Sequence, residues 1–143
     1  MSSVVKVSEA ATLALHAMAF LAANPGERFS AKQIAGLHGV SEAHLSKVLQ
    51  RLAKVGLLDS ARGPKGGFVL ARPAEQITLL DVYEAVDGPL RPTTCLLGTP
   101  ICNGRGCIMG DVLKTVNEQT KNYLTQTSVL DVAGTYRGES DDD

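Results

Sequence analysis

The sequence predicts a mainly α-helical fold with a small β-hairpin. Several segments repeat apolar residues at the three-and-four spacing of an amphipathic helix, and each follows a serine or threonine that can cap it. Two short apolar segments also flank one glycine-rich turn. With 143 residues, of which 44% are hydrophobic, the chain is long enough for one compact core and too short for two ordinary domains.

The first four predicted helices cover residues 8–23, 31–38, 42–55 and 79–86. The residues that can cap them are Ser8, Ser30, Ser41 and Thr78, because a hydroxyl oxygen accepts a hydrogen bond from the first turn. Gln33 and Asp81 each stand three residues after a cap and complete a capping box. In the second helix we expect Ile34 and Leu37 to face the core.

The third helix has two contrasting faces. Its apolar stripe consists of Leu45, Val48, Leu49, Leu52 and Val55. The opposite face is polar and basic: His44, Ser46, Lys47, Gln50, Arg51 and Lys54. A helix of this kind packs its apolar side on the core and presents the other side to a partner.

The predicted β-hairpin follows the third helix, with strands at 57–62 and 68–70 and a turn at 63–67. Residues 88–107 hold three prolines, four glycines and all three cysteines, and show no periodicity. A last long helix is predicted from about residue 108 or 111 to residue 124, and residues 128–132 add a short turn.

The charge distribution points to a polyanionic partner. Between Lys32 and Arg72 seven basic residues stand against two acidic ones, so this segment carries +5 and the rest of the chain −6. Two short helices followed by a hairpin form a winged helix-turn-helix, whose second helix fits the major groove of DNA.

This arrangement assigns candidate DNA contacts to two elements. The side chains expected to face the bases lie near the start of the third helix: Ser41, Ala43, His44, Ser46 and Lys47. Arg51, further along, is expected nearer to phosphates. Arg62 or Lys65 of the hairpin turn is expected to enter the minor groove.

The cysteines predict a metal site. Cys95, Cys102 and Cys107 are an odd set in a glycine-rich segment, which argues against a disulfide framework. Thiolates are soft ligands that suit iron–sulfur clusters, zinc or copper. A zinc knuckle and three buried cysteines that act as small hydrophobes are the alternatives, although the paired spacing typical of zinc is absent.

Several motifs together resemble the Rrf2 family of winged-helix transcription regulators, which includes the iron–sulfur sensors IscR and NsrR. They occupy residues 33–35, 40–45, 52–58, 60–71, 77–82 and 84–88, and the resemblance extends over about residues 6–133. It implies a homodimer, held by the long C-terminal helix, that binds near-palindromic operators in double-stranded DNA. Ser41 and Arg62 match family positions that contact DNA. Ser46 stands where IscR has a glutamate, so the operator need not be an IscR operator.

The resemblance also implies an iron–sulfur cluster, 2Fe–2S or 4Fe–4S, on Cys95, Cys102 and Cys107. The gaps of six and four residues depart from the family's usual five and five. IscR uses a histidine where this chain has Gly110. In NsrR-like members the fourth ligand comes from the partner subunit's N-terminal helix, where the candidates are Glu9, Thr12 and His16; Glu9 and His16 have the better donor chemistry.

The predicted function is therefore a transcription regulator whose operator affinity is controlled by an iron–sulfur cluster that senses redox state, nitric oxide or iron supply. The alternative is a cluster-free winged-helix regulator that senses through oxidation of its thiols. An enzyme is not expected, since the sequence shows no phosphate-binding loop, paired catalytic carboxylates or nucleophile–base constellation. No stretch approaches the roughly 20 apolar residues of a membrane span, and a secretion signal is not visible, so we expect a cytoplasmic protein.

The expected organisation has four parts. Residues 1–88 form the winged helix-turn-helix, 89–107 the cysteine loop, 108–133 the dimerisation helix with its short turn, and 134–143 a disordered acidic tail.

Overall fold

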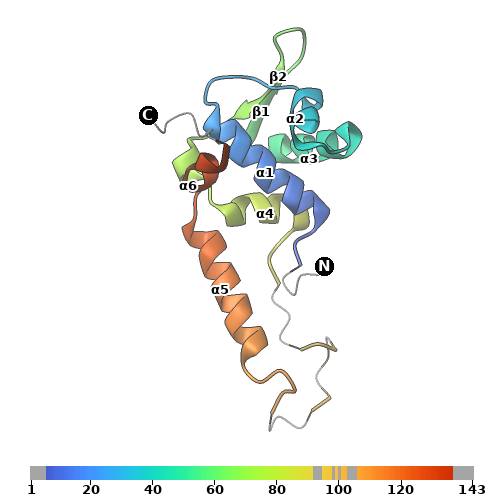
Figure 1. Ribbon diagram of the computed structural model, residues 1–143, viewed down its shortest axis with the longest axis vertical. Coiled ribbons are helices and arrows are strands. Elements are labelled where there is room, and N and C mark those ends of the chain that lie inside the picture. Colours follow the sequence, from blue (N-terminus) through green and yellow to red (C-terminus); the bar gives the residue numbers. More distant parts are fainter. Residues whose placement is uncertain (1–5, 92–94, 98, 100, 103–105, 137–143) are drawn as a thin grey trace.

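The computed structural model describes residues 6–91, 95–97, 99, 101–102 and 106–136. This part of the chain forms six α-helices, two 3-10 helices and one two-stranded antiparallel sheet, which lies at one end of the molecule (Figure 1). The α-helices are α1 (Glu9–Ala23), α2 (Ala31–His38), α3 (Glu42–Lys54), α4 (Leu79–Asp87), α5 (Val112–Gln126) and α6 (Val129–Val132). The strands are β1 (Leu58–Ala61) and β2 (Gly67–Leu70), and the 3-10 helices are η1 (Ala74–Gln76) and η2 (Ala133–Tyr136). The predicted mainly helical fold with a small hairpin is confirmed.

The predicted caps explain where these helices begin. The hydroxyls of Ser8, Ser30, Ser41 and Thr78 each accept a hydrogen bond from a backbone N–H of the first turn. Capping boxes form at α2 and α4 as predicted, and a third forms at α6 between Ser128 and Asp131. Each cap satisfies an amide that would otherwise have no partner inside the helix.

The core is built around α1, which packs against α3, α4, α6 and η2. Ile34 and Ala35 of α2 and the stripe Leu45, Val48, Leu49 and Leu52 of α3 are buried there, as predicted for Ile34 and the stripe. These side chains hold the two helices of the helix-turn-helix against α1, so the opposite face of α3 remains in solvent.

Two predicted core residues are exposed instead. Leu37 is 66% exposed, because the buried face of α2 is centred between Ile34 and Ala35 and Leu37 lies about 100° away around the helix. Val55 is 52% exposed, because α3 ends at Lys54 and the chain turns there. Leu57, only 3% exposed, takes the next core position in its place.

The hairpin is attached to the body by a backbone bridge. Phe29 and Phe68 exchange hydrogen bonds of 3.2 and 2.8 Å between their amides and carbonyls, so one residue of the segment before α2 forms an isolated antiparallel bridge with β2. Gly67 has a φ of 129°, and a Cβ there would lie 2.7 Å from the backbone of Phe29. Glycine at this position is what allows the bridge to form.

The C-terminal part returns to the body at α4. The Leu79 amide donates to the Thr127 carbonyl, and the Val129 amide donates to the Ile77 carbonyl. Helix α5 begins at Val112, one residue after the later predicted start, and ends two residues beyond the predicted end, and α6 is the predicted short turn. Figure 1 shows α5 projecting away from the other helices, and Leu124 is its one buried residue.

Three residues of the predicted disordered tail belong to a 3-10 helix instead. Residues 134–136 belong to η2, which packs against α1. They are held there because Tyr136 packs its ring on Phe20 and bonds to His38. Residues 137–143, the rest of the predicted tail, lie outside the described residues.

Candidate DNA interface and cysteine loop

The first turns of α3 present an exposed polar surface. Ser41, Ala43, His44 and Lys47 are exposed, and Ser46 is half-buried. The Ser41 hydroxyl accepts from the His44 amide at 3.3 Å and so defines where the helix starts. The positive end of the helix dipole therefore faces solvent at the residues predicted to meet DNA, which favours a phosphate there.

Two of these side chains already have partners within the protein. His44 Nδ1 lies 3.5 Å from Glu9 Oε1, a salt bridge when the imidazole is protonated. The hydroxyl of Ser46 accepts from Gln50 Nε2 at 3.2 Å. His44, Glu9 and Gln50 are exposed and Ser46 is half-buried, so either contact can be exchanged for a contact with a ligand at small cost.

Arg51 has a partner within the protein that was not predicted. Its Nη1 donates to the backbone carbonyl of Val86, in the last turn of α4, at 2.9 Å. The structure thus directs this guanidinium toward α4, where it satisfies a carbonyl at the negative end of the helix.

The hairpin turn carries the two predicted basic side chains. Arg62 and Lys65 are both exposed, and the turn is closed by a 2.9 Å hydrogen bond from the Gly66 amide to the Gly63 carbonyl. Figure 1 shows the hairpin extending beyond the helices on the same side of the molecule as α2 and α3. The arrangement of a wing beside a helix-turn-helix is therefore present.

Arg28 positions the wing and was not predicted. Its Nη2 lies 2.9 Å from Asp59 Oδ2, and its Nη1 donates to the Gly67 carbonyl at 3.3 Å. One guanidinium thereby joins the segment before α2 to both strands of the hairpin. The partners are 31 and 39 residues away in the chain, so no local pattern could have revealed them.

The three thiols are free, and the structure does not bring them together. Cys95 is half-buried, and Cys102 and Cys107 are exposed. The Met109 amide donates to Cys107 Sγ at 3.4 Å, a contact of the kind that stabilises a thiolate. Within the described residues no three Cys, His, Asp or Glu side chains are grouped as metal ligands. The donor chemistry fits a soft metal or a cluster, but the arrangement of these cysteines is not that of an assembled site.

The two fourth-ligand candidates lie on one side of α1 but in different surroundings. Glu9 is exposed beside His44, as described above. His16 is exposed, and its Nδ1 donates to the Thr12 carbonyl at 2.7 Å. No hydrogen-bond partner for His16 Nε2 is found in the described part of the chain, so this nitrogen is available to a ligand.

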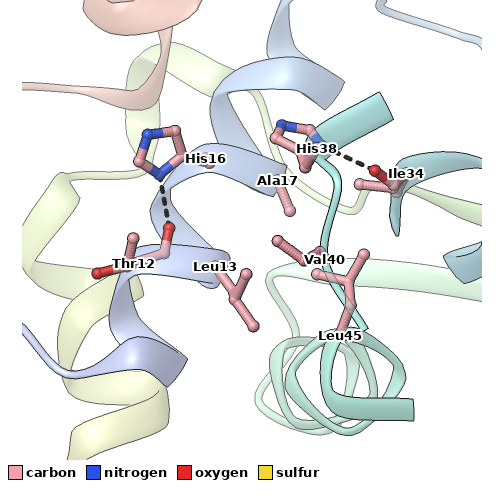
Figure 2. Close-up of a pocket in the computed structure, with 8 residues that line it drawn as sticks. All are labelled: Thr12, Leu13, His16, Ala17, Ile34, His38, Val40 and Leu45. Carbon is pink, nitrogen blue, oxygen red and sulfur yellow. Dashed lines mark hydrogen bonds between the residues drawn. The ribbon is translucent and has the colours of Figure 1, made fainter. Parts of the chain in front are cut away.

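His16 lines a pocket between α1 and the helix-turn-helix (Figure 2). The pocket has a volume of about 170 Å³ and is bordered by Thr12, Leu13, His16, Ala17, Ile34, His38, Val40 and Leu45. Its walls are mostly apolar, and the imidazoles of His16 and His38 lie with ring centroids 6.4 Å apart.

His38 joins α2 to the C-terminal segment, a link that was not predicted. Its Nδ1 donates to the Ile34 carbonyl at 2.8 Å, so its Nε2 accepts the hydroxyl hydrogen of Tyr136 at 2.7 Å. Phe20 packs edge-on against both rings. Burial raises the pKa of Tyr136 above its ordinary value of 10.0.

No described helix combines the length and the apolar character that a membrane span requires.

Comparison with known proteins identifies the family. The family model Rrf2, described as "Iron-dependent Transcriptional regulator", matches residues 7–135. The chain is similar to an Aquifex aeolicus (strain VF5) protein classed by name as an HTH-type transcriptional regulator, with 30% identity over 128 residues, 87% of this chain and 89% of the relative.

Two solved structures show the same fold. CymR, titled the global cysteine regulator of B. subtilis, has 26% identity and a TM-score of 0.76, with 92% of this chain and 98% of CymR covered. IscR from T. potens has 26% identity and a TM-score of 0.73, with 98% and 93% covered. The chain therefore belongs to the Rrf2 family and is a DNA-binding transcription regulator with a winged-helix fold.

Proposed function

We propose that this regulator binds near-palindromic operators as a homodimer in the cytoplasm, and that an iron–sulfur cluster on Cys95, Cys102 and Cys107 controls its operator affinity. The observation that carries the proposal is the placement of a three-thiol loop between α4, which packs on the DNA-reading helix, and α5, which projects from the body. The cysteine loop thus connects α4, a helix that contacts α3, with the candidate dimer helix.

The proposed DNA contacts rest on exposure and charge. Ser41, Ala43, His44, Ser46 and Lys47 lie at the start of α3, and Arg62 and Lys65 lie on the wing. The segment from 32 to 72 carries a net +5, which supplies the phosphate attraction on which protein–DNA affinity depends. Direct base contacts would come from α3 and minor-groove contacts from the wing.

The proposed dimer rests on α5. This helix packs chiefly on α4, and its exposed apolar side chains include Val112 at 52% and Tyr123 at 58%. A second copy of the helix would remove this apolar surface from water. Two reading helices held in this way must lie about 34–36 Å apart to engage adjacent half-sites together.

The cluster would be held by the three thiolates and one group from the partner subunit's α1, either Glu9 or His16. When bound, it would supply a redox-active centre that oxygen or nitric oxide can attack. This chain's own residues would orient it: Gly106 permits close backbone approach, and the Met109 amide is directed at a ligand sulfur. The description of the family as iron-dependent supports this assignment.

The test compares operator binding by three anaerobic samples: protein reconstituted with iron and sulfide, metal-free protein, and the Cys102→Ala variant. A coupling of about 1–3 kcal/mol between loop and operator gives a 5- to 150-fold difference between the first sample and the others. Random duplex DNA serves as the control. Equal operator affinity in all three samples refutes cluster control, whereas no preference for any promoter fragment refutes the regulator itself.

A second candidate, sensing through thiol oxidation without a cluster, is favoured by the exposure of Cys102 and Cys107. Iron and sulfide analysis of anaerobically purified protein separates the two. Stoichiometric iron and sulfide support the cluster, and metal-free protein whose affinity responds to mild oxidation supports the thiol switch.

A further inference from the structure

The last turn of α4 is bonded to three separate parts of the molecule. Arg51 of α3 donates to the Val86 carbonyl at 2.9 Å. Ser8, the cap of α1, donates to both carboxylate oxygens of Asp87 at 2.8 and 2.7 Å. The Leu90 amide, at the start of the cysteine loop, donates to Glu84 Oε2 at 2.9 Å. Glu84, Val86 and Asp87, which lie within four residues of one another, therefore connect α3, α1 and the cysteine loop.

The other end of α4 is bonded to the end of α5. The Leu79 amide donates to the Thr127 carbonyl at 2.9 Å, and the Val129 amide donates to the Ile77 carbonyl at 2.8 Å. Figure 1 shows α4 lying between α3 above and α5 below, with the described loop residues at the end of the molecule opposite to the hairpin. The chain thus leaves the C-terminal end of α4, runs through the cysteine loop and α5, and returns to the N-terminal end of α4.

Arg51 makes a side-chain hydrogen bond between this helix and α3, which also pack on one another. Its hydrogen bond to Val86 involves a charged donor and a carbonyl at a helix C-terminus, two features that each strengthen the contact. The contact fixes the guanidinium toward α4 and away from the exposed residues at the start of α3. A side chain held in this way can orient the helix that carries it.

We infer that Arg51 is a positioning residue, and that the end of α4 transmits the state of the cysteine loop to α3 through the Glu84–Leu90 and Arg51–Val86 contacts. This inference rests on the proposed regulatory function, because it specifies how loop and operator are coupled.

The first experiment separates positioning from phosphate contact. Operator affinity is measured against salt concentration for wild type, Arg51→Met and Arg51→Lys, with circular dichroism to confirm folding. The slope of log K against log salt is negative, and removing one phosphate contact reduces its magnitude by about 0.9. We expect Arg51→Met to weaken operator binding about tenfold with an unchanged slope, and Arg51→Lys, which keeps a donor, to recover most of the loss. A slope whose magnitude falls by about one unit in Arg51→Met overturns the positioning role.

Lys54 provides the matched control. It is exposed on the same helix, and no hydrogen bond or ion pair of its side chain is found in the described residues. The Lys54→Met variant removes one charge at a similar distance along α3 without disturbing α4. Loss of affinity at unchanged slope in Lys54→Met, equal to that in Arg51→Met, would also overturn the inference, since it would show a general effect of charge removal.

The second experiment measures coupling without any cluster. Because coupling between two sites is reciprocal, operator binding must alter the loop if the loop alters operator binding. The rate at which iodoacetamide alkylates half-buried Cys95 in metal-free protein is measured by mass spectrometry with and without saturating operator DNA. We expect at least a fivefold change in wild type and in Glu84→Gln, which keeps an acceptor oxygen for Leu90.

The same change must be lost in Arg51→Met and in Glu84→Ala. An operator-dependent change that persists unaltered in both variants overturns the inference while the proposed function stands. Failure of wild type to bind any operator in the same assay instead refutes the proposed function, so the two failures are distinguishable.

Discussion

Glu9 of α1 and His44 of α3 lie 3.5 Å apart, from Oε1 to Nδ1. A residue proposed to serve the cluster and a residue proposed to read bases thus occupy one corner of the molecule. The Glu9 carboxylate also places a negative charge beside the surface proposed to meet phosphates.

In metal-free protein, where Glu9 holds no cluster, replacing it with Gln is expected to raise operator affinity about two- to threefold, because a charge about 10 Å from a phosphate in water contributes a few tenths of a kcal/mol. Fluorescence anisotropy with labelled operator measures the change, and the gain is larger at low salt. Glu75→Gln, at an exposed position of η1 outside the proposed DNA and dimer surfaces, is the control and leaves affinity unchanged. Weaker binding by Glu9→Gln would show that Glu9 holds His44 in its DNA-binding orientation.

Ser41 is expected to serve both folding and DNA binding, and two variants separate these roles. Ser41→Ala loses the cap of α3 and lowers the free energy of unfolding by about 0.5–2 kcal/mol. Ser41→Asp keeps a capping oxygen and therefore the stability, but its charge repels phosphate and weakens operator binding at least tenfold. Chemical denaturation and operator titration measure the two effects. Full operator affinity in Ser41→Asp would exclude Ser41 from the interface.

Gly67 is expected to tolerate no side chain. Gly67→Ala forces a Cβ within 2.7 Å of the Phe29 backbone at a φ of 129°, so we expect it to lower the free energy of unfolding by about 1–3 kcal/mol. Gly36 is the matched control, since it lies inside α2 with nothing within 4 Å of an added Cβ. Gly36→Ala is expected to stabilise the protein by up to about 1 kcal/mol. Equal stability of both variants would refute the bridge between Phe29 and Phe68.

Arg62 and Lys65 are expected to bind DNA without contributing to the fold, because both side chains are exposed. Replacing either with Met reduces the magnitude of the slope of log K against log salt by about 0.9 and leaves the melting temperature unchanged. Operator titrations at several salt concentrations provide the slope. An unaltered slope in both variants would show that the wing does not approach the phosphates.

Tyr136 is expected to stabilise the protein through its hydroxyl. Tyr136→Phe removes the hydrogen bond to His38 and lowers the free energy of unfolding by about 0.5–1.5 kcal/mol at neutral pH. Because burial raises the pKa of Tyr136 in the folded state, the unfolded state loses this proton first, and stability falls as pH rises above about 10. Denaturation curves between pH 7 and pH 11 should show a smaller fall for Tyr136→Phe than for wild type. An identical fall would show that Tyr136 does not carry this dependence.

The elements that could be predicted are those whose cause is local. Ser30 and Gln33 meet across one helical turn, and so do Thr78 and Asp81, so their spacing in the sequence already specifies the capping boxes. The hairpin follows in the same way from its glycine-rich turn. The exposed face of α3 was also predictable, because helical periodicity alone separates its apolar stripe from its polar side.

The contacts that join these elements could not be predicted, because their partners are far apart in the chain. His38 meets Tyr136 across 98 residues, and Arg51 meets Val86 across 35. The exposure of Leu37 likewise depends on the angle at which α2 packs on α1, which the periodicity of an eight-residue helix leaves undefined.

The sequence by itself thus determined the helices, their caps, the wing and the donor chemistry of the cysteine loop, since each depends on residue types within a few positions of one another. Tertiary structure alone decided which side chains of α3 lie free in solvent, which are held by other helices, and that α4 joins the loop to α3. The physical reason is that packing many side chains at once, rather than any short pattern, sets the distance between residues remote in the chain.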